Sequence, residues 1–313
     1  MFAYISKRLI GMFVVLTIVT VVVFLLVRVA PGDPVAVMLG SDATSEDIVR
    51  LRDQLGLNDS LPQQFLSFAA QITRGDLGNS IFLGRPVLTA LAERAEPTLI
   101  LTLLSLLIAC AIALPAGVIA AYRRGGFLDQ FVSGSAMLLA SVPNFWLGLL
   151  LIQFFAVGFG ILPVSGYGLP GADLTERLRH LLLPALTLGF VSSALIMRFT
   201  RSSMLDVLSE DYVRTARAKG VSEWRVVLRH ALKNALIPIL TVIGMTAAIL
   251  VAGSVVIETV FGLPGIGNLV VNAVIRRDYP VIQGALLIVA ALYVIINFMI
   301  DMLYLLIDPR VRY

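Results

Sequence analysis

Six long apolar stretches constrain the fold of this chain more than any other feature. They lie near residues 9–30, 98–121, 131–159, 181–199, 236–257 and 284–307. A helix needs about 20 mostly apolar residues to cross the roughly 30 Å hydrocarbon core of a bilayer. Only 14% of the residues are charged, whereas soluble domains carry about 25%. The sequence therefore predicts an all-helical integral membrane protein with six transmembrane helices in a lipid bilayer.

The first stretch is expected to be an uncleaved anchor, residues 1–30, rather than a signal peptide. Lys7 and Arg8 precede it, but its apolar run is longer than the roughly 7–15 residues of a signal sequence. Arg28 is expected to reach toward the interface. The third stretch is long enough to tilt or to end in an interfacial turn. Pro184 stands near the start of the fourth.

Lysine and arginine residues set the expected orientation, because the cytoplasmic loops of membrane proteins retain them. With the N-terminus inside, 14 lie on the cytoplasmic side: Lys7, Arg8, Arg123, Arg124, Arg198, Arg201, Arg214, Arg217, Lys219, Arg225, Arg229, Lys233, Arg310 and Arg312. Nine lie outside: Arg50, Arg52, Arg74, Arg85, Arg94, Arg177, Arg179, Arg276 and Arg277. We therefore expect both termini inside, and the net charge of +4 indicates topology rather than a nucleic-acid partner.

Residues 31–97 form the largest predicted outer segment, which is periplasmic or extracellular. We expect one helix capped by Ser45 and a second that starts at Pro62, since Ser is a favoured N-cap and Pro a favoured first-turn residue. Arg74 and Gly75 are expected to end the second helix. The segment is too small for a core of its own. It either packs on the outer mouth of the membrane domain or forms a solvated connector.

Polar or irregular positions near the spans are candidates for a pathway. Residues 261–267 hold three glycines and a proline, which excludes a regular helix. Irregular backbone at membrane depth is tolerated only where protein or a cavity covers it, so this loop is either a re-entrant plug or an interfacial turn. Intramembrane polar groups are functional candidates by default. The pathway or gate residues are therefore predicted to be Asn144, Gln153, Phe261, Pro264 and Asp301.

Residues 200–235 form the longest predicted cytoplasmic segment, which we call the knob. Its first helix is expected to carry an apolar face made of Leu205, Leu208, Tyr212 and Ala216 and to end at Gly220. Ser222 is expected to cap a second helix, with an apolar stripe made of Trp224, Val227, Leu228, Ala231 and Leu232. Such a rigid pair of helices fits either a groove on another protein or the membrane surface.

Two runs in the knob carry a family resemblance. The run Asp211–Gly220, DYVRTARAKG, and the run Arg229–Pro238, RHALKNALIP, closely resemble the EAA loop of ABC importer permeases. The form is that of the dipeptide/oligopeptide/nickel branch, and similar stretches occur along nearly the whole chain. The general motif begins with Glu where this chain has Arg214, and the spacing from Gly220 to Pro238 is longer. Both departures are typical of the peptide branch, and the larger outer segment is similar to the first of its two permeases.

The resemblance implies a type I importer permease fold and a division of labour. Residues 98–307 would form the permease core and residues 308–313 a cytoplasmic tail. The knob would couple to separate ATPases through Arg214, Thr215, Ala216, Arg217, Gly220, Val221, Ser222 and Glu223. The implied partners are a second homologous permease, two ABC ATPase subunits that bind ATP and magnesium, and an external substrate-binding protein. The resemblance also implies that the chain is a multi-pass subunit located in the bacterial inner membrane.

The motifs that are absent agree with a permease that carries no ATPase. None of the three lysines, Lys7, Lys219 and Lys233, follows a glycine, so the phosphate-binding loop of ATPases is missing. The implied cargo is small peptides, and nickel, glutathione or another small solute is the alternative. A secondary transporter or channel would need an inverted repeat or a charged relay, and an intramembrane enzyme would need a catalytic set. The sequence supplies none of these.

Overall fold

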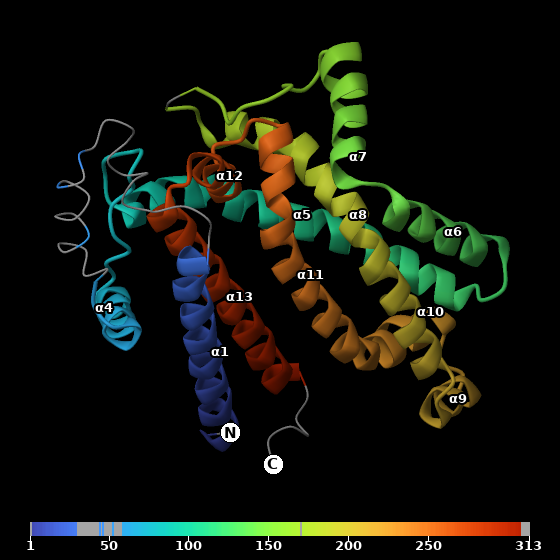
Figure 1. The fold of residues 1–313 in the computed structure, drawn as a ribbon. Helices are drawn as coiled ribbons and strands as arrows, with labels where there is room; N and C mark the ends of the chain where they lie inside the picture. The colour runs from blue at the N-terminus through green and yellow to red at the C-terminus, as the bar shows by residue number, and fades with distance from the viewer. Residues whose placement is uncertain are drawn as a thin grey trace. The chain divides into compact units, whose positions relative to one another are not determined.

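The computed structural model describes residues 2–29, 44, 46, 52, 58–169 and 171–307. Its elements in chain order are α1 (Phe2–Val29), α4 (Leu61–Thr73), α5 (Val87–Tyr122), α6 (Phe127–Ser141), α7 (Asn144–Leu151), η1 (Ile152–Gly158), α8 (Leu174–Leu208), α9 (Asp211–Ala218), α10 (Glu223–Arg225), η2 (Val226–Ala231), α11 (Leu232–Val260), α12 (Ile266–Arg276) and α13 (Tyr279–Ile307) (Figure 1). The segments η1 and η2 are π-helical. The described residues thus form the all-helical fold that the sequence predicts.

The chain divides into two compact units. Unit 1 comprises Met1–Glu96 and Asn268–Val294, and unit 2 comprises Pro97–Gly267 and Ile295–Tyr313. Five helices are long and apolar enough to cross a membrane, and the bent pair of α6 with α7 and η1 makes a sixth candidate among the described residues. The predicted set of apolar spans is confirmed at this level.

In unit 1, the helix expected at Pro62 is confirmed as α4, and it packs against α1. Ser60 and Gln63 form a capping box at its start. The ring of Phe24 lies 5.3 Å from that of Phe65, and Arg28 donates to the Gln64 side chain at 2.6 Å. This part of the outer segment is therefore not a freely solvated connector. The helix expected after Ser45 lies outside the described residues.

A buried carboxylate organises the other part of unit 1. Asp278 is 2% exposed and lies between α12 and α13. It accepts hydrogen bonds from the Ser80 hydroxyl at 2.5 Å and from the backbone amide of Phe82 at 3.2 Å. Because each carboxylate oxygen satisfies backbone or hydroxyl donors, the charge is compensated although it is buried. The 80–82 loop and the start of α13 are thereby held together.

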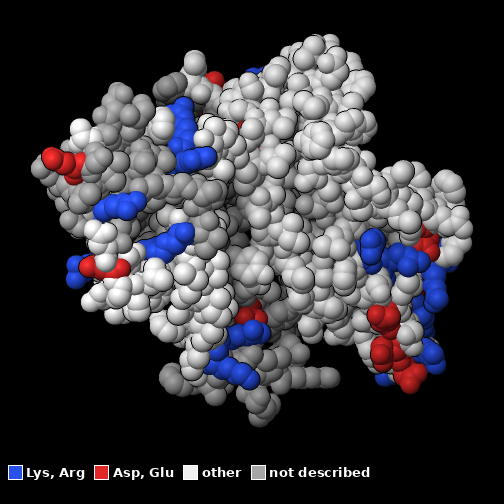
Figure 2. Space-filling model, in the orientation of Figure 1, with Lys and Arg blue, Asp and Glu red and all other residues white. Residues whose placement is uncertain are grey.

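In unit 2, α8 lies at the centre and packs against α6, α7 and α11 (Figure 1). Its inner face contributes to a core of fully buried apolar side chains: Leu101, Leu181, Leu183, Leu188, Leu250, Ile257, Phe261 and Leu263. Other large apolar side chains remain exposed, among them Phe145, Trp146 and Phe154. The surface over α7 and η1 carries no charged side chain in Figure 2. This is the pattern of a helix bundle whose outer faces meet lipid or other apolar partners.

The sequence predicts that the third apolar stretch is a single span that tilts or ends in an interfacial turn. The structure differs from this prediction. The stretch breaks in its middle, where α6 and α7 meet at an angle of 101°. Val142 is extended, with ψ 126°, because the following Pro143 disfavours helical backbone in the residue before it. Pro143 then occupies the N-cap position of α7. Two residues thus turn one long apolar run into a bent pair.

Several helix ends also lie beyond the predicted spans. α5 begins at Val87 rather than near 98, and α8 runs from Leu174 to Leu208 with Pro184 inside it. Residues Glu223–Val260 form one continuous helical run through α10, η2 and α11, and its apolar window is long enough to cross a membrane. Hydropathy locates the lipid-facing part of a helix, whereas packing and caps determine where the helix ends.

Candidate functional site: the knob and the 261–267 loop

The knob contains the tight turn that its sequence predicts. α9 ends at Ala218, and Gly220 has φ +76°, the left-handed conformation that favours glycine. The Gly220 amide donates to the Arg217 carbonyl at 2.9 Å, and the Val221 amide donates to the Ala216 carbonyl at 3.2 Å. Ser222 then occupies the N-cap position of α10, without a capping hydrogen bond from its side chain. A Cβ at Gly220 would meet no atom within 4 Å, so the turn is open to a partner.

An ion pair closes this turn from both sides. The Arg217 guanidinium donates to the two carboxylate oxygens of Glu223 at 2.9 Å and 3.4 Å. Both side chains are partly exposed, so the pair stabilises the turn by less than about 1 kcal/mol. On the preceding turn of α9, Arg214 pairs with Asp211 at 3.3 Å, and the Thr215 hydroxyl donates to the Asp211 carbonyl. The predicted coupling residues therefore lie on α9, in its turn and at the start of α10, and most of them are exposed.

The predicted apolar faces of the knob are wrong in part. The first helix is interrupted at Ser209, whose amide bonds to Asp206 and Val207, and α9 starts afresh after Glu210. This break changes the helical phase. Val213 is therefore the fully buried residue of α9, whereas Tyr212 is 42% exposed. In the second helix Val227 and Ala231 are buried as expected, but Trp224 is 66% exposed.

A buried cluster and an ion pair anchor the base of the knob. Side chains from α5, α8, η2 and α11 form the cluster: Val118, Ala121, Met204, Val227, Ala231, Ala235 and Ile239. Next to it on α8, Arg201 donates to Asp129 at the start of α6, with 2.8 Å from Nη2 to Oδ2. The Asp129 carboxylate is 5% exposed and also accepts from the Gly125 amide. The buried cluster and this ion pair thus fix the knob to the helices around it, including α6.

The 261–267 loop is built around a buried carboxylate. Glu258, near the end of α11, is fully buried and accepts a hydrogen bond from the Thr98 hydroxyl at 2.6 Å. That hydroxyl oxygen accepts in turn from the Ile266 amide at 2.9 Å. The Leu263 amide donates to the Glu258 carbonyl at 2.8 Å. One acidic residue therefore organises both ends of the loop.

Glycines and one aromatic ring complete this packing. A methyl group at Gly265 would overlap the Glu258 carboxylate, and one at Gly267 would lie 2.6 Å from the Val255 Cα. Phe261 is 1% exposed and packs against Gly148 of α7, and its carbonyl accepts from the Gly166 amide at 2.9 Å. The loop is thus covered by protein on several sides, as irregular backbone at membrane depth would require.

The predicted pathway residues fall into three places. Phe261 and Pro264 lie in the covered loop, with Phe261 buried and Pro264 partly exposed. Asn144 begins α7 and Gln153 lies in η1, on either side of the stretch that packs on Phe261. Asp301 lies on α13 next to Ile300, whose side chain fills the space beside Gly244 of α11.

The sequence interpretation missed Glu258, Thr98 and the Asp129–Arg201 pair. The fifth span was predicted to end at 257, so Glu258 counted as part of an outer loop. Continuing the helix by one turn would have revealed it as an intramembrane acid. No local signal indicates the Asp129–Arg201 pair, since 72 positions separate the two residues. Among the described residues, no group of three His, Cys, Asp or Glu side chains could hold a metal ion.

Comparisons with known proteins agree with this geometry. Residues 113–313 match the family model "Binding-protein-dependent transport system inner membrane component", and residues 1–102 match the N-terminal model of the same transport systems. The inward-facing MetNI methionine ABC transporter has a similar fold, with a TM-score of 0.60 at 22% identity over 70% of this chain and 96% of that one.

Two curated relatives are similar along their whole length. The "Probable peptide ABC transporter permease protein y4tP" of Sinorhizobium fredii is 47% identical over 99% of both chains. The "Glutathione transport system permease protein GsiC" of Escherichia coli O6:H1 is 45% identical over 100% of both. The chain therefore belongs to the inner membrane permeases of binding-protein-dependent ABC transport systems, in the dipeptide/oligopeptide branch.

Proposed function

We propose that this chain forms part of the path by which short peptides enter the cell, driven by ATP that other subunits hydrolyse. Membership of the family implies ATPase partners and a permease partner. The composition proposed is a second homologous permease, two ABC ATPases that bind ATP and magnesium, and an external substrate-binding protein. Peptides are proposed as the cargo because the relative from Sinorhizobium is named for them.

The knob carries the coupling in this proposal. Its turn at Gly220 is open, its helices are short, and its base is fixed to α5, α6, α8 and α11. A rigid projection of this kind transmits force, because its buried base cannot move without moving the helices around it. The exposed Trp224 offers a large apolar contact to a groove. Closure of an ATPase dimer would then bias the permease between inward- and outward-facing states.

The orientation proposed places both termini and the knob in the cytoplasm. The excess of basic residues on the knob supports it, since positive charge is retained inside. The 160–180 loop and α12 would then lie on the outer side, where a binding protein delivers its cargo. The 261–267 loop would serve as part of the gate, because it is irregular yet largely covered by protein at the end of α11. Asn144, Gln153 and Asp301 remain proposed pathway positions.

Glutathione is the second candidate cargo. A relative of 45% identity over the full length is named for glutathione transport. Glutathione is itself a small peptide-like anion, so the same path can serve both. Competition between labelled dipeptide and glutathione for uptake would separate the two.

ATP-dependent uptake is the test of this function. The whole complex, reconstituted into vesicles with its binding protein, should accumulate labelled peptide only with ATP and magnesium. Accumulation driven by an ion gradient without ATP would instead indicate a secondary transporter. Peptide-independent leakage would indicate a channel.

A further inference from the structure

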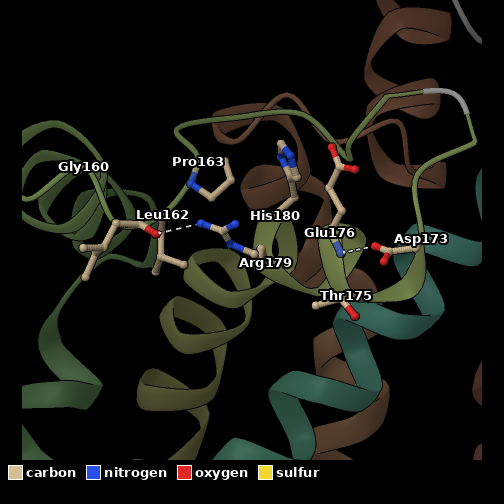
Figure 3. A pocket seen from close by; sticks show the side chains of 9 residues that line it. Gly160, Leu162, Pro163, Asp173, Thr175, Glu176, Arg179 and His180 are labelled. Atoms are coloured by element: carbon tan, nitrogen blue, oxygen red, sulfur yellow. Dashed lines mark hydrogen bonds between the residues drawn. The ribbon is translucent and has the colours of Figure 1, made fainter.

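A pocket in the 160–180 region of unit 2 belongs neither to the knob nor to the 261–267 loop. Its volume is about 580 Å³, within the roughly 300–1,000 Å³ range of small-molecule sites. One wall is the backbone-rich segment 160–163 (Figure 3). The other comes from the start of α8 and carries the polar side chains: Asp173, Thr175, Glu176, Arg179 and His180. The pocket is therefore neutral on one side and charged on the other.

Opposite charges in this pocket are held apart. Glu176 and Arg179 are three residues apart on α8, a spacing at which such residues commonly form an ion pair. Here the Arg179 guanidinium turns instead to the Ile161 carbonyl, at 3.4 Å (Figure 3). Among the described residues, no hydrogen bond or ion pair engages the Glu176 carboxylate. Both charges thus remain available to a ligand that carries the complementary pair.

His180 lies between Glu176 and Arg179 and adds a hydrogen-bond acceptor to the pocket. Its Nδ1 is 3.1 Å from the Ser165 carbonyl oxygen, which can only accept, so Nδ1 carries the proton. In the neutral ring Nε2 is then an acceptor. Asp173 uses one carboxylate oxygen to cap α8 through the Glu176 amide at 2.8 Å. Acceptors thus lie near Glu176, and the donors lie on Arg179.

A zwitterionic short peptide matches this arrangement. Its ammonium group suits Glu176 and the His180 Nε2, and its carboxylate suits the planar fork of Arg179. Side chains three apart on a helix have Cβ atoms about 5–6 Å apart, and two residues of extended chain span at most about 7 Å. The length of a dipeptide is therefore comparable with the spacing of the two side chains along α8.

We propose that this pocket is an entry site that holds the two termini of a short peptide before the peptide passes into the transport path. The site deepens the proposed function and rests on it. Exposed charge contacts are individually weak, so we expect a dissociation constant in the millimolar range. A docked binding protein releases its cargo beside the pocket at an effective concentration of about that size, so a weak site suffices.

The test combines peptides that have one terminus blocked with variants of the pocket residues, so that each terminus is matched to one side chain. Binding of dialanine, N-acetyl-dialanine and dialanine amide to the complete transporter in nanodiscs, without binding protein, is measured by saturation-transfer NMR. We expect acetylation to weaken binding to the wild type about two- to fivefold but to change nothing in Glu176→Gln. The amide should weaken binding to the wild type but not to Arg179→Gln. Glu93→Gln, in unit 1, is the matched control and should behave as wild type.

Two results would overturn the site. The pocket does not recognise peptide termini if dialanine fails to bind. The same conclusion follows if the blocking groups weaken binding equally in all variants. Variants that change only the capture of the binding protein would assign the pocket to docking of that protein. ATP-dependent uptake by the same complex would in either case leave the proposed function intact, whereas its absence would refute that function separately.

Discussion

The knob turn around Gly220 and the 261–267 loop are both short irregular connections between helices, yet they are stabilised in opposite ways. The knob turn is exposed, and its contacts are local, such as Arg217 with Glu223 six positions away. The loop is buried, and its central hydrogen bond joins Thr98 to Glu258, 160 positions away. Local contacts leave a surface free for a partner, whereas long-range contacts fix a piece of backbone within one chain.

The largest effect is expected at Gly220. Valine there must adopt φ near +76°, which costs about 1–2 kcal/mol, so the turn rearranges and the knob loses its docking geometry. Uptake should fall more than tenfold while the amount of protein in the membrane is unchanged. Gly75→Val is the matched control, since Gly75 has φ +77° and equally open space. Normal uptake by Gly220→Val would remove the coupling role from the turn.

Gly265→Ala is expected to act on folding instead. Its methyl group would overlap the Glu258 carboxylate, and overpacking of this kind costs about 1–3 kcal/mol. Thermal unfolding in detergent should occur at a lower temperature, and Glu258→Asp should restore part of the loss by shortening the acid. Gly253→Ala on α11, the helix that carries Glu258, has open space and should unfold as wild type does. Equal behaviour of the two alanine variants would refute the packing described for the loop.

Thr98→Val tests the long-range hydrogen bond itself. It removes the donor to Glu258 and the acceptor of the Ile266 amide, so a cost of about 1–2 kcal/mol is expected. Thr102→Val is the control, because the Thr102 hydroxyl only bonds back to the Thr98 carbonyl on its own helix. Denaturant unfolding should separate the two variants. If Thr102→Val is as costly, the Thr98 bond has no special part in holding the loop.

The smallest effect is expected for Glu223→Gln in the knob. The pair with Arg217 is partly exposed, so its loss should cost less than about 1 kcal/mol. Uptake should fall less than about fivefold, and the difference from wild type should shrink at high salt, which screens exposed charges. A loss as large as that of Gly220→Val would mean that the ion pair, and not the backbone turn, controls docking.

The sequence predicted those parts of the molecule that depend on local signals. Apolar length located the spans, Pro62 located α4, and Gly220 with Ser222 located the knob turn. The predicted apolar face of the first knob helix was wrong because the helix is interrupted at Ser209. The four residues at helical spacing therefore belong to two helices. Periodicity describes a face only while the helix continues.

The remaining features depend on contacts that no local pattern encodes. The 101° bend at Pro143 needs a tertiary environment to set its angle, although the proline itself is visible in the sequence. The pairing of Asp129 with Arg201 and of Thr98 with Glu258 follows only from the packing of distant helices. The sequence shows that Glu176 and Arg179 are charged, but it does not show that they line a pocket and do not pair with each other.

The most direct test of the account asks what the knob touches. A photo-crosslinking residue at Ser222, which is exposed and whose side chain makes no capping bond, is activated in native membranes, and the products are sequenced. The account predicts crosslinks to a P-loop ATPase that are lost in Gly220→Val. Crosslinks to lipid alone, unchanged by Gly220→Val, would contradict it and would make the knob a membrane-surface element.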